Sequence, residues 1–117
     1  MKNRNTQART EEQRLEYINF VRESVLKFYI SKYEVFKTLP EDTLFFKALK
    51  VQPVTKKAIC EAFDLNIEAM CRFKRTAEKN GTLKQSKKKV ICQYTGHYAH
   101  LLTTNTFLFN SEQFSND

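Results

Sequence analysis

Residues 55–91 of the chain read TKKAICEAFDLNIEAMCRFKRTAEKNGTLKQSKKKVI, and this stretch decides the fold. Up to Gly81 its apolar residues recur every three to four positions, which is the period of a helix. After Gly81 they recur at the two-residue period of a strand. Glycine is also the residue that most often follows a helix in a left-handed conformation. The stretch therefore predicts helices before Gly81 and β-strands after it.

Two short helices joined by a tight turn are expected before Gly81. Thr55 is expected to cap the first helix and Asn66 the second, because their side-chain oxygens can accept from N–H groups of the first turn. The turn is formed by residues 64–66, and the second helix ends at Asn80. The apolar residues expected to face the core are Ile59, Ala62, Phe63, Leu65, Met70, Phe73 and Ala77.

A further helix is expected directly upstream. It begins within residues 38–42, where a hydroxyl, a proline and two acidic residues suit a helix start. Pro53 ends it, and Val54 begins a short strand. Its buried side is expected to consist of Leu44, Phe45, Ala48 and Leu49.

A longer helix is expected in the N-terminal segment 10–36, from about Thr10 to about Tyr33. Thr10 and Gln13 fit a capping box. The apolar residues at helical spacing behind it are Leu15, Ile18, Val25 and Tyr29. This helix is expected either to pack on the rest of the domain or to act as a dimerisation element.

The region after Gly81 is expected to form three short strands separated by two turns. Strands are predicted from Leu83, at 90–94 and at 98–104, with a charged Ser-Lys-Lys-Lys turn at 86–89 and a second turn at 95–97. Residues 105–117 are expected to form a C-terminal tail that apolar side chains clip to the core.

Length and composition set the broader class. The 117 residues suit one domain covering 1–117, and only two Gly and two Pro argue against a turn-rich all-β fold. The fold class expected is therefore mainly α with a small β-hairpin. No apolar run approaches the ~20 residues of a membrane span, and the polar N-terminus lacks a signal peptide. These features predict a cytoplasmic protein whose three Cys are reduced.

The sequence resembles winged helix-turn-helix DNA-binding domains over about residues 40–104, preceded by the long N-terminal helix. The positions that match the family pattern are Thr55, Ile59, Ala62, Leu65, Met70 and Gly81. The longer pattern through QYTGHYAHLLTTN (93–105) is similar to small winged-helix proteins of bacterial prophages and other mobile elements. The chain departs from the family where Ala77 replaces a Leu, and where Lys74 occupies an inward position that Phe73 is expected to fill.

The charge of the chain is concentrated in the same region. The formal net charge is +7, and residues 66–89 contain eight Lys and Arg against two Glu. A basic chain favours polyanions as partners. The expected function is therefore sequence-specific binding of double-stranded DNA, in transcriptional regulation or in transactions of a mobile element's DNA.

The expected DNA contacts fall into two groups. The second helix is expected to enter the major groove, where Arg can pair with guanine and Glu with the cytosine amine. Its contact residues are Asn66, Glu68, Ala69, Arg72, Arg75 and Lys79. The DNA backbone is expected to meet Thr55, Lys56, Lys57, Lys84, Lys87, Lys88 and Lys89, with Lys87–Lys89 at the tip of the wing.

Other functions are less well supported by the residues. Cys92, His97 and His100 lack the paired short spacings of a zinc site, and no nucleophile motif or phosphate loop is present. No metal, cofactor or enzymatic activity is therefore expected. Two alternatives stay open: a protein-docking module that uses the N-terminal helix, also the candidate homodimer element, and an RNA-binding protein in which Tyr94 and Tyr98 stack on bases.

Overall fold

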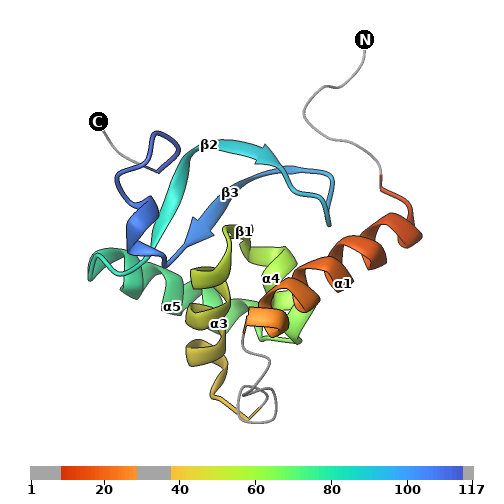
Figure 1. Ribbon diagram of the computed structural model, residues 1–117, viewed down its shortest axis with the longest axis horizontal. Helices are drawn as coiled ribbons and strands as arrows, with labels where there is room; N and C mark the ends of the chain where they lie inside the picture. Colours follow the sequence, from red (N-terminus) through yellow and green to blue (C-terminus); the bar gives the residue numbers. More distant parts are fainter. Residues whose placement is uncertain (1–8, 29–37, 115–117) are drawn as a thin grey trace.

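The computed structural model describes residues 9–28 and 38–114. In chain order its elements are α1 (Glu11–Phe28), α3 (Glu41–Val51), β1 (Val54–Thr55), α4 (Lys56–Phe63), α5 (Ile67–Lys79), β2 (Lys84–Ile91), β3 (Tyr98–Thr103) and the 3-10 helix η2 (Thr106–Leu108). Figure 1 shows a curved sheet above α3, α4 and α5, with α1 to one side and the C-terminal segment to the other. The fold is α+β, and the two helices expected before Gly81 are present as α4 and α5. No helix among the described residues is long and apolar enough to cross a membrane.

Local signals define both ends of α5, as expected. The Asn66 side chain accepts a hydrogen bond from the Ala69 N–H at 2.8 Å, which caps the first turn. At the other end Gly81 adopts φ +77°, and Thr82 N–H donates to the Ala77 carbonyl at 2.9 Å. This is the Schellman arrangement, which only a residue tolerant of positive φ closes without strain.

The core side of α5 also agrees with expectation. Met70 and Ala77 are buried, and Leu65 in the preceding turn is buried too. The Phe73 ring packs edge-on against Phe45 and Phe46, with ring centroids 5.9 and 6.5 Å apart. Phe73 thus fills the space beside the inward position that Lys74 occupies in the sequence.

Helix α1 packs against α4. Its first turn carries the expected capping box, in which the backbone N–H of Thr10 and of Gln13 each donate to the other residue's side chain at 3.0 Å. The buried residues of α1 are Ile18, Val21 and Val25. The expected stripe is wrong at its start, because Leu15 is 59% exposed. The expected continuation to Tyr33 lies outside the described residues.

A hydrogen bond also joins α1 to α4. The Arg22 Nε donates to the Ala62 carbonyl, near the end of α4, at 2.8 Å. Carbonyls in the last turn of a helix lack an intrahelical partner, so this bond satisfies one of them. Leu15, Phe20 and Phe28 are left exposed on α1.

The three strands form one antiparallel sheet in the order β1-β3-β2. β1 lies beside β3, with Val54 opposite Leu102. The end of β3 is joined to α3, because the Thr104 hydroxyl donates to the Phe46 carbonyl at 2.7 Å. The sheet is therefore attached to the helices at both β1 and the end of β3.

The turn expected at 86–89 is wrong, because β2 runs continuously through these residues. Gln85 lies opposite Leu102 and Lys89 opposite His100, so β2 covers four residue steps where β3 covers two. The extra residues form a β-bulge, which keeps the pairing intact on both sides. The turn of the hairpin lies at residues 92–97 and includes the second turn expected at 95–97, while the strand expected at 90–94 ends at Ile91.

The side chain of Ser86 holds this bulge. Its hydroxyl donates to the Lys88 carbonyl at 2.7 Å and accepts from the Leu101 N–H at 3.0 Å. Ser86 is buried, so both bonds lie away from bulk water. The hydroxyl thus takes the place of ladder bonds that the extra residues cannot form.

The segment expected as a C-terminal tail is part of the fold up to Phe114. The Phe114 side chain is 1% exposed, and the backbone N–H of Lys87 donates to the Gln113 carbonyl at 2.9 Å. The Lys84 ammonium donates to the carbonyls of Phe109 and Phe114 at 3.2 and 3.4 Å. These bonds attach the segment to β2.

The burial of Phe114 gives a stability prediction. Phe114→Ala should lower the free energy of unfolding by about 3–5 kcal/mol, because a buried aromatic ring is lost and a cavity remains. Phe107→Ala is the matched control, since Phe107 lies in the same segment and is 93% exposed. Its effect should stay within about 0.5 kcal/mol. Urea unfolding of both variants measures the two free energies. If Phe114→Ala also lost no more than about 0.5 kcal/mol, the segment would not stabilise the fold.

Candidate nucleic-acid interface

One side of α5 presents a row of charged side chains to solvent. Glu68, Arg72, Arg75 and Lys79 follow one another at steps of four, three and four residues, so they lie on one face of the helix. All four are exposed, and the face lies opposite the buried Met70 and Ala77. Three of the four carry positive charge. This row, Glu68, Arg72, Arg75 and Lys79, is called the α5 basic face.

The two arginines of this face are not neutralised within the described part of the chain. The ion pair found on α5 joins Lys74 to Glu78, with 3.4 Å between the nitrogen and oxygen atoms. Neither Arg72 nor Arg75 forms an ion pair with the described residues, and their pairing with Glu68 or Glu78, which the helical spacing allows, is not seen. Both guanidinium groups are therefore available to a ligand.

Two residues expected on the recognition surface have structural roles instead. Ala69 is half-buried and packs against the core. The Asn66 side chain is used in the helix cap, and its backbone N–H donates to the Glu41 carboxylate at 3.3 Å. Asn66 is exposed at the edge of the α5 basic face, whereas Ala69 turns toward the body of the protein.

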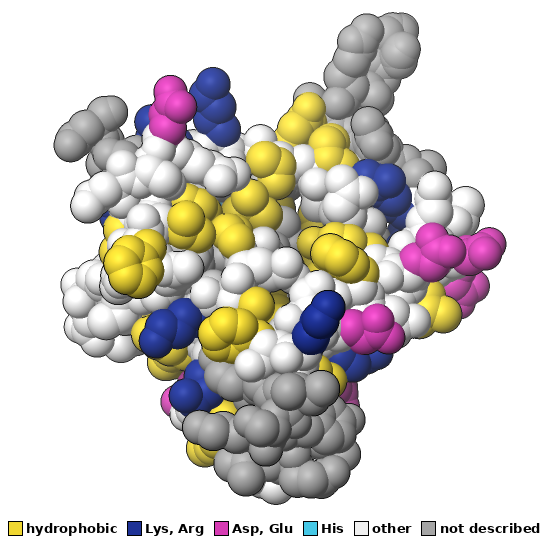
Figure 2. Space-filling view, in the orientation of Figure 1, with side chains coloured by type: hydrophobic (Ala, Val, Ile, Leu, Met, Phe, Trp, Pro, Cys, Tyr) yellow, Lys and Arg dark blue, Asp and Glu magenta, His cyan; other side chains and the backbone are white. Residues whose placement is uncertain are grey.

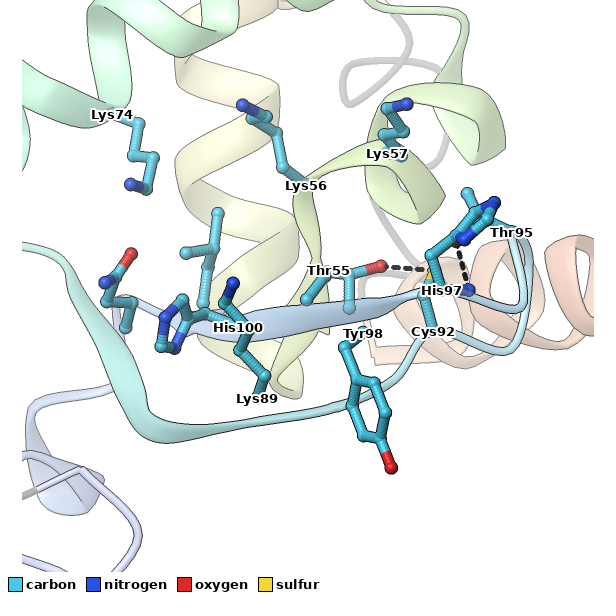
Figure 3. Close-up of a pocket in the computed structure, with 13 residues that line it drawn as sticks. Thr55, Lys56, Lys57, Lys74, Lys89, Cys92, Thr95, His97, Tyr98 and His100 are labelled. Atoms are coloured by element: carbon cyan, nitrogen blue, oxygen red, sulfur yellow. Dashed lines mark hydrogen bonds between the residues drawn. The ribbon is translucent and has the colours of Figure 1, made fainter. Parts of the chain in front are cut away.

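A cationic groove of about 370 Å³ lies between α5, the start of α4 and the β2–β3 hairpin. Figure 3 shows lysines from the helices facing His97, His100 and Lys89 from the β2–β3 hairpin. The charged or titratable side chains that line it are Lys56, Lys57, Lys74, Lys89, Cys92, His97, Tyr98 and His100, and the lining includes no Asp or Glu. Figure 2 shows no histidine on the face of the molecule that it presents.

The start of α4 lines this groove through Thr55, Lys56 and Lys57. Thr55 is the N-cap residue of α4, as expected, but its hydroxyl does not cap the helix. Its hydroxyl lies 2.9 Å from the Cys92 sulfur, it makes no cap bond, and the residue is 3% exposed. The first N–H groups of α4 therefore lack a side-chain partner, and a helix N-terminus in this state favours anions.

Lys56 and Lys57 are the first two residues of α4. The Lys56 ammonium lies 2.8 Å from the Cys71 sulfur on α5, which holds this lysine across the upper side of the groove. Lys57 is exposed. Both residues line the cationic groove.

The β-bulge separates lysines that are adjacent in sequence. Lys89 lines the cationic groove, whereas Lys87 and Lys88 line a second cavity of about 450 Å³ beside Glu112 and Gln113. The expected wing tip of Lys87–Lys89 is therefore wrong, because these residues belong to a strand and are directed to two different places.

Lys84 also differs from expectation. It is half-buried, and its ammonium is bonded to two carbonyls of the C-terminal segment and lies 5.8 Å from the Phe109 ring centroid. It is occupied within the fold and does not belong to the cationic groove.

The sequence interpretation missed three groove residues: Lys74, His97 and His100. The histidines were considered only as metal ligands, and the described residues contain no group of three or more side chains placed to hold a metal ion. Alternation along β3 puts Tyr98, His100 and Leu102 on one side of the strand, so the period of two was a usable signal. The pairing of His100 with Lys89 could not be predicted from this period, because it depends on the bulge.

Comparisons of the chain with protein families, with characterised proteins and with solved structures find no match. The interpretation of this surface therefore depends on its geometry and charge.

A buried thiol near the groove gives a pH prediction. Burial, together with the nearby Cys71, raises the pKa of Cys60 to about 12, so the folded thiol holds its proton more tightly than the unfolded one. Stability from this group is present below the unfolded pKa of about 8.5 and is lost as the pH rises above it. Between pH 8 and pH 10.5, Cys60→Ala should therefore lose less unfolding free energy than the wild type, by about 2 kcal/mol. Cys71→Ala is the control, and urea unfolding at both pH values measures the change. Parallel losses in wild type and Cys60→Ala would contradict the prediction.

Proposed function

We propose that this chain binds double-stranded DNA as a winged helix-turn-helix protein, with α5 as the recognition helix and no catalytic role. One observation carries the proposal: the unpaired arginines of the α5 basic face lie on the same helix as Lys74, which lines a groove without acidic residues. A helix with an exposed basic face fits the major groove, which is about 12 Å wide. The neighbouring cationic groove suits a phosphate backbone.

The order of the elements supports the winged-helix part of the proposal. α3, β1, α4 and α5 are followed by the β2–β3 hairpin, and β1 pairs with β3. In this interpretation α4 and α5 form the helix-turn-helix, and the hairpin is the wing. The tip of the wing is then residues 92–97 and not the lysine run.

The base contacts follow from the side chains of the α5 basic face. Arg72 and Arg75 each present a planar guanidinium that can donate two parallel bonds to guanine. Glu68 can accept a bond from a cytosine amine. The lysines of the groove contribute affinity that does not depend on sequence. Such a protein would regulate transcription or act on the DNA of a mobile element.

A second candidate function is protein docking, including a homodimer through α1. The observation that favours it is the exposure of Leu15 and Phe20, both 59%, and of Phe28, 69%, on that helix. RNA binding is a third candidate, because Tyr98 is 43% exposed and lines the cationic groove. Competition between duplex DNA and single-stranded RNA separates the nucleic acids.

The first test reverses the charge of the α5 basic face. The double variant Arg72→Glu/Arg75→Glu should bind duplex DNA at least about 100-fold more weakly, because two cations become anions that repel phosphate. Fluorescence anisotropy at two salt concentrations measures binding. For the wild type the logarithm of affinity should fall with log salt by about 0.9 per neutralised phosphate.

Lys27→Glu/Lys50→Glu is the matched control for this test. It makes the same change in net charge at two exposed lysines of α1 and α3. It should weaken binding by only about threefold, through long-range charge alone. Equal losses in the two double variants, or no wild-type binding at low salt, would contradict the proposal and favour docking.

The second test uses two adjacent lysines. Lys89→Ala should weaken DNA binding about fivefold and lower the salt slope by about one, because Lys89 faces the cationic groove. Lys88→Ala removes the same charge one residue away, on the side of the C-terminal segment. Its effect should be less than about twofold. If Lys88→Ala is the more damaging variant, the groove is not the backbone site.

A further inference from the structure

His100 is held in one orientation within the cationic groove. It belongs to β3 and is half-buried, and its Nδ1 lies 2.7 Å from the backbone carbonyl oxygen of Ser86. Figure 3 shows its imidazole beside Lys89 and below Lys74. Lys89 is its cross-strand neighbour in the β2–β3 pairing.

The bulge at Ser86 determines which nitrogen of His100 carries a proton. A carbonyl oxygen can only accept a hydrogen bond, so Nδ1 must be the donor. In the neutral ring Nε2 then has no proton and accepts. A phosphate oxygen is itself an acceptor, so neutral His100 cannot bond to it through Nε2. Once Nε2 is protonated, the ring becomes a cation that donates to an anion.

The surroundings of His100 are cationic. Lys89 on β2 is the cross-strand neighbour, and Lys74 on α5, which is paired with Glu78, lines the same groove. The other titratable or charged groups that line the groove are Lys56 and Lys57 on α4, Cys92 after β2, and His97 and Tyr98 in the hairpin. No carboxylate among the lining residues compensates a protonated imidazole, so a bound anion is the partner that would.

We propose that the cationic groove binds a phosphate group between Lys89 and His100, and that His100 takes up a proton when the phosphate binds. The inference rests on the proposed DNA binding, and it adds that this binding is linked to pH. Ser86 is a positioning residue, because its carbonyl fixes the ring. Binding should tighten as the pH falls from 8 to 6, because the protonated ring donates to the phosphate.

Duplex affinity measured at pH 6, 7 and 8 and at one ionic strength tests the inference. Wild-type binding should be about fivefold to tenfold tighter at pH 6 than at pH 8, because one linked proton changes affinity by up to tenfold per pH unit. In His100→Gln the change should fall to about twofold. His97→Gln removes the other imidazole of the chain and should retain the wild-type slope, whatever its affinity.

The results separate this inference from the proposed function. If the wild type binds DNA, and its affinity changes with pH as much as that of His100→Gln, the inference is overturned. The proposed DNA binding then still stands. A slope lost in His97→Gln but kept in His100→Gln also overturns it. Thermal unfolding of each variant checks that the fold is retained.

A titration with sulfate tests the proposed anion site without DNA. Sulfate stays doubly charged from pH 6 to pH 8, so a change across this range reports on the protein. The ring resonances of His100 in NMR spectra should shift with sulfate at pH 6 and not at pH 8. If sulfate shifts them but no duplex binds, the groove takes a small anion and the proposed function fails. If sulfate leaves them unchanged at pH 6, the inference fails.

Discussion

The position of β3 between β1 and β2 is the constraint on which the rest of the structure depends. On one side Val54 of β1 pairs with Leu102, and β1 leads directly into α4. On the other side β2 pairs with β3 through the bulge held by Ser86. β3 therefore positions both the start of α4 and the side chains of the hairpin. The cationic groove lies between them because both are fixed to β3.

Electrostatics explain why this surface differs from the rest of the molecule. The visible acidic side chains in Figure 2 lie mainly over α1, away from the sheet. The groove collects lysines from α4, α5 and β2 without a compensating carboxylate in its lining. Cations gathered in this way repel one another and lower the stability of the folded state. A cluster of cations that opposes folding, and that no carboxylate of its lining neutralises, is typical of a binding site.

The same region leaves backbone groups without side-chain partners. The Thr55 hydroxyl is directed to Cys92 rather than to the start of α4. Helix α5, in contrast, is capped by Asn66 and closed by Gly81. The two helices therefore have different tasks in the proposed interface: α5 is a rigid support for exposed side chains, and the start of α4 offers N–H groups to an anion.

The sequence by itself determined the helices and the α5 basic face. Caps such as Asn66, the left-handed Gly81 and the helical period act within a few residues, so they can be identified without a partner segment. The tertiary structure alone decided that Lys89 turns toward the groove while Lys87 does not, and that Phe114 is buried while Phe107 of the same segment is exposed. The direction of a side chain in a strand depends on register with the neighbouring strand, and a bulge changes that register locally. Burial of a distant aromatic ring likewise depends on which surface it meets, and local sequence does not specify that surface.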